Sequence, residues 1–287
     1  MKTQPNVLVT GASSGIGWAV TEALTARGIR VFGSVRTRHD AERLLNAFKE
    51  QVVPLIFDTT DVDAVAAATK QVRDRLDNEP LFGIVNNAGT GTAAPLLYVP
   101  IAEFRQQFEV NVIGTLNVIQ HFVPLLRSTG RTPGRVINIG STAGRIGIPF
   151  FGAYAASKHA LNGLSESLRR ELLPYGIDVI TVVPGPVKTP IWDKAESLDF
   201  RAYRGTPYAG LIDTFRDVMV RDGRNGMEPR VIGDAVFTAL TTSRPRSTYV
   251  CVTGLLKNWI LPTQLPSRWV DRLIGDQLGL TAKTDEK

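Results

Sequence analysis

The feature that most constrains the fold is a glycine-rich turn between a short apolar run and a helical pattern near the start of the chain. Residues 6–10 read N-V-L-V-T, which is typical of a buried strand, and T-G-A-S-S-G-I-G follows at 10–17. Residues 16–26 then show helical spacing. Glycines at such a place permit a tight turn and let a pyrophosphate approach the N–H groups that open the helix. The arrangement predicts a dinucleotide-binding α/β fold.

The glycines of this turn are Gly11, Gly15 and Gly17, spaced as G-x-x-x-G-x-G rather than as the common G-x-G-x-x-G. The physical use is the same, and serine hydroxyls in the turn can add hydrogen-bond donors. The cofactor contacts expected here are Gly11, Ser13, Ser14, Gly15, Ile16 and Gly17.

The end of the next predicted strand, 30–35, indicates which dinucleotide binds. NAD enzymes place an acidic residue there to hold the ribose 2′-OH, whereas an arginine suits a 2′-phosphate. Here Val35 stands where the acid would be, and Arg36 follows it. An arginine–phosphate hydrogen bond of about 1.5–3 kcal/mol would favour NADP(H) by about tenfold to a hundredfold. The alternative is that Arg36 is only a solvated charge at a strand end.

Three side chains further along form a candidate reaction centre: Ser141, Tyr154 and Lys158. Ser141 follows a predicted strand over 135–139, opened by a turn at 132–134, at the sheet edge where open α/β folds bind ligands. Tyr154 and Lys158 are four residues apart on a predicted helix and therefore share one face. A close ammonium should lower the pKa of the phenol, so that Tyr154 could exchange a proton with a substrate oxygen. Alone, the Tyr-x-x-x-Lys pair is common on helices by chance.

Together these motifs resemble those of the short-chain dehydrogenase/reductase family, which carries a serine, a tyrosine thirteen residues later and a lysine four further, as here. The resemblance is strong over residues 6–190 and loose beyond them. It implies one Rossmann-type domain over 1–287, a doubly wound parallel sheet of about seven strands with helices on both faces. It also implies NAD(P)-dependent interconversion of a ketone or aldehyde and its alcohol. One departure is Ser14, where NADP-preferring relatives often carry a basic residue.

The resemblance assigns two roles near the reaction centre. Asn111 lies in N-V-I-G within a predicted helix over 101–126, and in the family this asparagine bends the helix and binds a water that connects to the lysine. Lys158 would also hold the nicotinamide ribose. The alternative for Asn111 is an incidental buried amide.

Three further loops are implied to contact the cofactor. Asp58 would meet the adenine amino group, although a helix N-cap role for Asp58 or Asp61 is an alternative. The first amide of N-N-A-G, Asn86, would tie down a neighbouring strand. In P-G-P-V-K-T-P, the backbone near Val187 would meet the carboxamide and Thr189 a phosphate or the amide. The contacts from these loops are Asp58, Thr59, Asn87, Ala88, Gly89, Pro184, Gly185, Val187 and Thr189, beside Tyr154 and Lys158.

Residues 191–228 are expected to form a substrate lid, because relatives build theirs there. The region is apolar and aromatic, as are Phe150 and Phe151 beside the reaction centre, and ordinary core packing is an equal alternative. The tail over 255–280 is an apolar extension, for which a packed helix, a subunit or lid contact and a membrane-surface helix are alternatives. The lid side chains are Trp192, Phe200, Tyr203, Tyr208, Leu211, Phe215 and Met219.

Within the family, G-R-I-G-I-P-F and the apolar tail are most similar to hydroxysteroid and retinol dehydrogenases and their bacterial relatives. This implies a bulky steroid-, retinoid- or lipid-like substrate. The alternatives are a reductase of small ketones or fatty-acyl intermediates, and a non-catalytic dinucleotide-sensing protein. Such sensors typically lose the tyrosine or the lysine, and both are present. Relatives dimerise through helices corresponding to 101–126 and 152–173, so a homo-oligomer, a dimer or tetramer, is expected.

Composition narrows the remaining classes. The chain is 43% hydrophobic and 21% charged, which is ordinary for a globular protein. Its one cysteine excludes an internal disulfide, and its three histidines show no metal-ligand spacing, so no metal site is expected. The net charge is +6, but the basic residues are scattered, which argues against nucleic acid. Residues 1–6 lead straight into a strand, and no apolar run approaches the ~20 residues of a membrane span, so a cytoplasmic location is expected.

Overall fold

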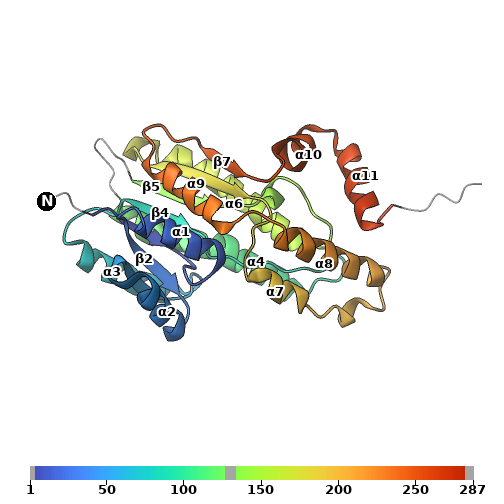
Figure 1. Cartoon of the computed structure of the whole chain (residues 1–287), viewed down its shortest axis with the longest axis horizontal. Coiled ribbons are helices and arrows are strands. Elements are labelled where there is room, and N and C mark those ends of the chain that lie inside the picture. Colours follow the sequence, from blue (N-terminus) through green and yellow to red (C-terminus); the bar gives the residue numbers. More distant parts are fainter. Residues whose placement is uncertain (1–3, 127–133, 282–287) are drawn as a thin grey trace, which may run out of the picture.

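The computed structural model describes residues 4–126 and 134–281, which are built around one seven-stranded sheet (Figure 1). All neighbouring strands are parallel, in the order β3-β2-β1-β4-β5-β6-β7. The order reverses between β1 and β4, which is the switch point of a doubly wound fold, and the predicted Rossmann-type sheet is confirmed. Of the turn expected at 132–134, only Gly134 belongs to the described residues. The strands are β1 (Asn6–Val9), β2 (Arg30–Val35), β3 (Val52–Ile56), β4 (Gly83–Asn86), β5 (Arg135–Ile139), β6 (Asp178–Pro184) and β7 (Thr248–Cys251).

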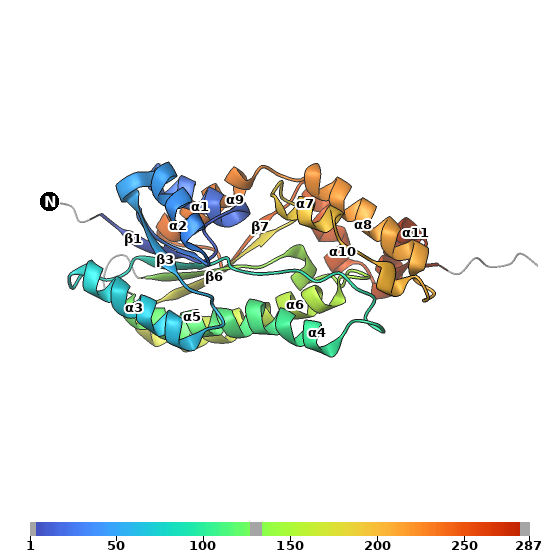
Figure 2. The same cartoon turned by 90° about the horizontal axis from the view of Figure 1, so that it is seen from below.

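Helices cover both faces of the sheet (Figure 2). One layer contains α1 (Gly15–Thr25), α2 (Arg38–Phe48) and α9 (Pro229–Thr241), and the other contains α3 (Val62–Leu76), α5 (Gly114–Phe122) and α6 (Gly152–Glu171). Strand β1 contributes side chains to the hydrophobic cores on both faces of the sheet. Val7 and Val9 belong to the core under the first layer and Leu8 to the core under the second, because successive side chains alternate across a strand.

The helix expected over 101–126 is one run of helical turns whose hydrogen-bond pattern changes along it. It begins as α4 (Ile101–Phe108), widens to a π-helical turn over Glu109–Ile113, continues as α5 and closes with a 3₁₀ turn. At the wide turn the N–H of Gly114 donates to the carbonyl of Glu109, five residues back. Such a turn inserts one extra residue into a helix and often marks a functional site. Asn111 lies at its centre.

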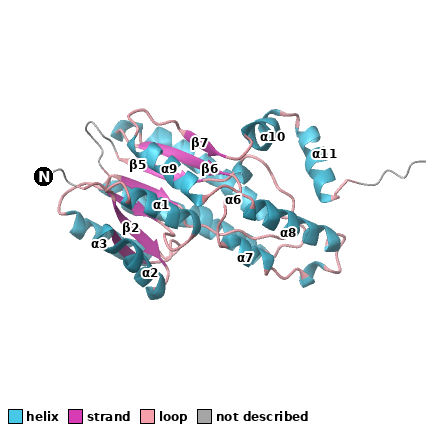
Figure 3. Cartoon of the chain, viewed as in Figure 1, coloured by secondary structure: helices cyan, strands magenta, loops and turns pink. Residues whose placement is uncertain are grey.

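Apart from α9 and β7, the C-terminal third lies beyond the carboxyl ends of the strands (Figures 1, 2 and 3). Its helices are α7 (Ile191–Glu196), α8 (Ala209–Arg224), α10 (Leu261–Gln264) and α11 (Ser267–Leu278), and a π-helical turn over Leu256–Ile260 precedes α10. Helices α8 and α11 and the loop residues Phe150 and Phe200 form a third core, whose buried members are Phe150, Phe200, Ile212, Phe215 and Leu278. This region therefore has an interior of its own and does not extend either core of the sheet.

Of the aromatic side chains expected in the lid, some are buried in the third core and others are half-buried beside it. Phe200 and Phe215 are buried in the third core, whereas Tyr203 and Tyr208 are half-buried at its margin. Trp192 serves neither purpose: its indole N–H donates to the Val187 carbonyl at 2.6 Å, and the ring fills the space left by a glycine of α8. Core packing thus accounts for part of the apolar pattern that the sequence shows here.

Helix α11 has two different faces. Ile274 and Leu278 pack into the third core on its inner side. On the outer side Trp269 is 63% exposed and Leu273 61% exposed. The packed-helix interpretation of the tail therefore describes only the inner face. Within residues 4–126 and 134–281, none of the helices combines the length and the apolar character needed to cross a membrane.

Candidate active site

The loops that carry the predicted site residues meet at the carboxyl edge of the sheet. The glycine-rich turn follows β1, N-N-A-G follows β4, Ser141 follows β5, and the loop with Thr189 follows β6. Their backbones are close: a Cβ added at Gly11 would lie 3.1 Å from the Cα of Ala88, and one at Gly15 would lie 3.2 Å from the Cγ2 of Thr189. The structure therefore brings the predicted cofactor and reaction residues to one edge, at the switch point between β1 and β4.

The turn after β1 is shaped for close approach of an anion. Gly11 and Gly15 have φ angles of +65° and +54°, which favour glycine, and a Cβ at Gly17 would collide with the Gly11 carbonyl. Ser14 is the N-cap of α1, but its side chain makes no capping hydrogen bond. The first N–H groups of α1 thus keep their capacity to bind a phosphate at the positive end of the helix dipole. These features fit a dinucleotide pyrophosphate.

A hollow beside the glycine-rich turn is lined in part by charged side chains. The hollow is lined by Ser13 and Ser14 on one side and by Lys188 and Glu228 on the other. Lys188 Nζ and Glu228 Oε1 lie 2.7 Å apart, and both side chains are exposed. The ammonium therefore stands next to the expected phosphate position, already paired with a carboxylate.

Two neighbouring asparagine side chains link the loop after β4 to adjacent segments of the site. Asn86 donates from Nδ2 to Asn138 Oδ1 at 2.8 Å, so it ties β4 to β5 as expected. Asn87 donates from Nδ2 to the carbonyls of Thr10 at 3.0 Å and Gly11 at 3.2 Å. The side-chain amide of Asn87 thus donates to the backbone of the glycine-rich turn and stabilises its conformation.

Arg36 lies just past the end of β2 and is exposed. The nearest acid that follows in the chain, Asp40, is already engaged: it accepts from the Thr37 hydroxyl at 2.8 Å and pairs with Arg43 at 3.2 Å. In the described part of the chain, no carboxylate comes within 4 Å of Arg36 to form an ion pair. The guanidinium remains available to an anionic ligand.

The capping alternatives after β3 are resolved by the hydrogen bonds. Asp61 caps α3, because its Oδ1 accepts from the N–H of Ala64 at 2.9 Å. Asp58 instead accepts from the N–H of Thr60 at 2.9 Å and from its hydroxyl at 2.7 Å, and it stays exposed. Thr59 is buried, and its carbonyl accepts from Asn117 of α5. Asp58 therefore has no helix-capping role.

The reaction centre joins the end of β5 to α6. The hydroxyl of Ser141 accepts from the N–H of Ala143 at 3.1 Å and interacts with the phenol of Tyr154. Lys158 is 6% exposed, and its Nζ donates to the carbonyl of Ile139, the last residue of β5, at 2.8 Å. The same Nζ lies 5.8 Å from the centre of the Tyr154 ring. A hydroxyl, a phenol and an amine thus occupy one small volume.

The electrostatics differ from the sequence-based expectation that Lys158 lowers the pKa of Tyr154. Burial raises the pKa of Tyr154, and the Ser141 hydroxyl acts against this shift without reversing it. Burial also lowers the pKa of Lys158 to about 8. The reason lies in the placement of the amine, because Nζ is directed at the Ile139 carbonyl and not at the phenolic oxygen. The predicted lowering of the pKa of Tyr154 was therefore wrong.

Asn111 is tied to the reaction centre through one further side chain. Its Oδ1 accepts from the N–H of Thr90 at 2.9 Å, while its Nδ2 donates to the Thr90 carbonyl at 3.0 Å and to Ser157 Oγ at 3.0 Å. Ser157 in turn donates to the Tyr154 carbonyl at 2.7 Å. Both N–H groups of the amide are used, so a water held by Asn111 would have to donate to one of its oxygens. The relay role of Asn111 stays a prediction.

Two side chains that sequence reasoning missed belong to this arrangement. Ser157 lies between Tyr154 and Lys158 in the chain, and the only available signal was its position one turn from Tyr154. Phe151 stacks on the Tyr154 ring at 4.4 Å between centroids and 25° between planes. It was noted only as part of an apolar pattern, because its contact with the phenol depends on how α6 begins.

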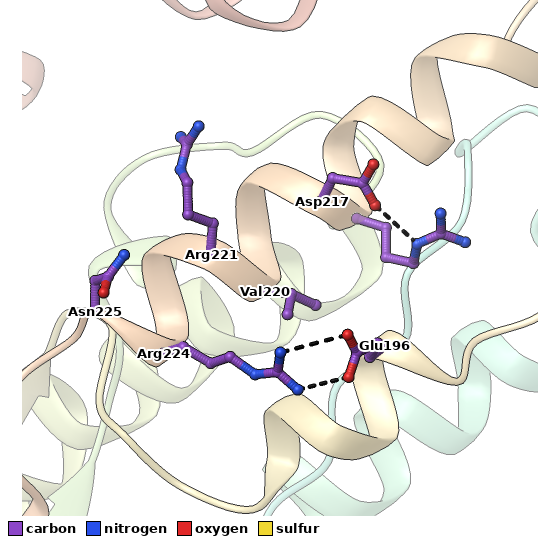
Figure 4. A pocket seen from close by; sticks show the side chains of 7 residues that line it. Glu196, Asp217, Val220, Arg221, Arg224 and Asn225 are labelled. Atoms are coloured by element: carbon purple, nitrogen blue, oxygen red, sulfur yellow. Dashed lines mark hydrogen bonds and ion pairs between the residues drawn. The ribbon is translucent and has the colours of Figure 1, made fainter.

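A second concavity lies between α7 and α8 (Figure 4). Arg224 forms a two-pronged pair with Glu196, and Arg216 pairs with Asp217 at 3.2 Å. These charges are neutralised within the wall itself, and none of the residues predicted for catalysis lines the concavity. Its residues are Glu196, Arg216, Asp217, Val220, Arg221, Arg224 and Asn225.

Comparison with known proteins adds a family context. The family model described as short chain dehydrogenase matches residues 5–198. An NADPH-dependent 3-dehydrocapnine reductase from Ornithobacterium rhinotracheale is 35% identical over 273 residues, covering 94% of this chain and 96% of that protein. Retinol dehydrogenase 16 of Mus musculus is 30% identical over 282 residues, covering 93% and 87%.

Solved structures agree with the sequence matches. A short chain dehydrogenase from Burkholderia cenocepacia in complex with NADP superposes with a TM-score of 0.70 at 26% identity, covering 94% of this chain and 97% of that one. A 3-oxoacyl-[acyl-carrier protein] reductase from Brucella melitensis with bound NAD gives 0.69 at 28% identity, covering 88% and 91%. Similar structures therefore occur with either dinucleotide.

Proposed function

Because this chain belongs to the short-chain dehydrogenase family and is an oxidoreductase of alcohol and carbonyl groups, we propose that it uses NADP(H) to interconvert a bulky lipophilic ketone or aldehyde and its alcohol. The observation that carries the proposal is the meeting of Ser141, Tyr154 and Lys158 beside the glycine-rich turn. These groups can bind and protonate a carbonyl oxygen at the edge where a dinucleotide would lie.

The chemistry assigned to each side chain follows from its surroundings. Ser141 orients the substrate oxygen toward the phenol of Tyr154. Because the pKa of Tyr154 is raised, the phenol keeps its proton at neutral pH and can donate it to a carbonyl oxygen, as reduction requires. Lys158, with a pKa of about 8, is largely charged at neutral pH. Because its Nζ donates to the Ile139 carbonyl, it would stabilise the phenolate that this donation leaves only after turning toward the phenol. A bound nicotinamide supplies the hydride.

The preference for NADP(H) rests on Arg36. Its guanidinium is exposed at the end of β2, and the next acid along the chain, Asp40, is occupied by Thr37 and Arg43. A 2′-phosphate would therefore meet a cation without a competing carboxylate beside it. The similarity to a reductase named as NADPH-dependent supports this choice.

The preference for a lipophilic substrate rests on the aromatic side chains next to the phenol. The half-buried Phe151 stacks on Tyr154, and the half-buried Tyr208 packs edge-on against the buried Phe150 with 5.6 Å between ring centres. Such a wall binds apolar surface and offers few fixed donors. The similarity to a retinol dehydrogenase supports the same substrate class. A reductase of small carbonyls is the alternative, because Phe200 and Phe215 are already used in the third core.

The test is consumption of NADPH at neutral pH against a ladder of carbonyls, from short ketones to compounds of retinal and steroid size, with NADH in parallel. Rates should rise with apolar bulk, and NADPH should be favoured by about tenfold to a hundredfold. Rates confined to small carbonyls would contradict the lipophilic substrate. NADPH binding without turnover of any member of the ladder would instead favour a dinucleotide-sensing protein.

A further inference from the structure

The loop that follows N-N-A-G is exposed to solvent but held from beneath by two buried amides. Thr90 and Gly91 are exposed. Under them lie Gln107, which is 0% exposed, and Asn111, which is 1% exposed. The two amides are four residues apart on the helical run of α4 and the π turn, so they project from the same side. Asn111 is assigned by the family resemblance, whereas nothing assigns Gln107.

Both ends of the Gln107 amide bind the backbone of this loop. Nε2 donates to the Thr90 carbonyl at 2.7 Å, and Oε1 accepts from the N–H of Thr92 at 2.8 Å. Asn111 binds the N–H of Thr90 and the same carbonyl. The two side chains thus satisfy three backbone groups over Thr90–Thr92, which would otherwise lack partners in a segment without regular structure.

The segment so held faces the reaction centre. A Cβ added at Gly91 would lie 3.0 Å from Cζ of Phe151 and 3.6 Å from Cδ2 of Tyr154, so Gly91 faces both rings and leaves little room for a side chain between them. A second tie follows, since the N–H of Ala94 donates to the Phe150 carbonyl at 2.8 Å. The loop therefore forms one wall of the space that Phe151 and Tyr154 occupy.

The reacting tyrosine is consequently held from two directions by one helix. Asn111 acts on its backbone through Ser157. Gln107 acts on its ring through the loop, Gly91 and Phe151. Because general acid catalysis requires the donor within hydrogen-bond reach of the substrate oxygen, a shift of the ring slows proton transfer.

We propose that Gln107 is a positioning residue for Tyr154: its buried amide clamps Thr90–Thr92 so that Gly91 and Phe151 hold the phenol in its reactive orientation. The proposal rests on the proposed function of Tyr154 as proton donor. It differs from a purely structural role, because it places the effect of Gln107 on turnover of folded enzyme and not only on stability.

Two substitutions test the clamp, and the chain supplies a matched control. Gln107→Met keeps the approximate size of the side chain and removes both hydrogen bonds. Gln107→Glu keeps an oxygen that can accept from the Thr92 N–H. It can donate to the Thr90 carbonyl only while its carboxyl group is protonated. Gln106→Met and Gln106→Glu make the same changes at the neighbouring position, where the glutamine is exposed.

Gln107→Met should lower kcat by about tenfold to a hundredfold, because the Thr92 N–H loses its partner and the Thr90 carbonyl keeps only the hydrogen bond from Asn111. The KM for NADPH should stay unchanged, because the glycine-rich turn is braced separately by Asn87. Hydrogen exchange of residues 90–92 should speed up in this variant. Gln106→Met should change neither kcat nor the exchange.

Gln107→Glu should give kcat a pH dependence that the wild type lacks. Burial raises the pKa of a carboxyl group. Below that pKa the acid donates to the Thr90 carbonyl and kcat approaches the wild-type value. As the pH rises through it, the donor is lost and kcat falls toward that of Gln107→Met. The measurement is kcat against pH over the range in which circular dichroism shows folded protein.

Unchanged kcat in folded Gln107→Met, or the same pH profile in Gln107→Glu and Gln106→Glu, would overturn the proposal. A lowered melting temperature with normal turnover would show a structural role only, which also overturns it. Hydrogen exchange needs no substrate, so unchanged exchange of residues 90–92 in Gln107→Met refutes the clamp whether or not the wild type turns over. Absence of wild-type turnover, with faster exchange in the variant, would instead refute the proposed function.

Discussion

The sheet with its helices and loops, residues 6–190 and 229–254, and the lid with the tail, residues 191–228 and 255–281, bury apolar surface in different ways. In the sheet, strands such as β1 feed two large cores, and amides such as Asn86 and Asn87 pin the loops that carry the chemistry. The lid and tail form one smaller core of aromatic and aliphatic side chains, with exposed ion pairs on the outside. Exposed pairs contribute little to stability, so this region depends on its few apolar contacts.

The difference suggests a division of labour. The residues that we propose to bind the dinucleotide and to move the proton follow the ends of parallel strands or lie on a helix packed against them. The residues that we propose to meet the rest of the substrate lie on helices with a separate core. We therefore expect substitutions in the first region to act on chemistry or on global stability, and those in the second to act on substrate size.

The largest effect should come from Tyr154→Phe, which removes the proton donor from the frame. Turnover should fall by about 10²–10⁴-fold, the usual contribution of general acid catalysis. NADPH binding, followed by fluorescence titration, should be nearly unchanged. Tyr175→Phe, at an exposed tyrosine beyond the same helix, is the control. Near-wild-type turnover of Tyr154→Phe would refute the assignment of the reaction centre.

The two regions can be compared directly with one substitution made in each. Leu8→Ala, at a fully buried leucine of β1, should lower the free energy of unfolding of the whole protein by about 2–5 kcal/mol. Leu278→Ala, at the leucine of α11 in the third core, should instead loosen the lid. Proteolysis within 191–228 should quicken and the KM for the largest substrate should rise, with NADPH affinity preserved. Equal loss of global stability in both variants would contradict two separately packed regions.

The free energy of unfolding should also depend on pH through the buried amine of Lys158. The native pKa of Lys158 is about 8, below its ordinary value, so the unfolded state binds more protons as pH rises above about 8. The free energy of unfolding should therefore rise from pH 8 to about 9.5, by about 2 kcal/mol from this group. Lys158→Met should lack this increment in urea unfolding of the cofactor-free protein. The same pH slope in both proteins would contradict a lowered pKa.

The smallest of these effects concerns the choice of dinucleotide. Arg36→Leu should reduce the ratio of kcat/KM for NADPH to that for NADH by about tenfold to a hundredfold, the contribution of one charge-assisted hydrogen bond. Arg73→Leu, at an exposed arginine of α3, should leave the ratio unchanged. An unaltered ratio in Arg36→Leu would mean that Arg36 is only a solvated charge.

Most of the frame was predictable because its signals are local. The apolar run of β1, the glycines after it and the four-residue spacing of Tyr154 and Lys158 are all readable from neighbouring residues. The contacts of Gln107 and Ser157 were not predictable, since Gln107 binds a loop 15–17 residues away and Ser157 binds an amide 46 residues away. The direction of the pKa shift of Tyr154 was missed for a related reason, because burial of the phenol among distant segments raises that pKa.

By itself the sequence determined the strands, the glycine-rich turn and the side chains that we propose to react, because periodicity and backbone freedom are properties of short segments. Only the tertiary structure decided which lid aromatic side chains are core, that Asp61 and not Asp58 caps α3, and that the Lys158 amine binds the Ile139 carbonyl. Those outcomes depend on which groups from distant segments are buried together, and burial sets both the hydrogen-bond partners and the pKa values of the site.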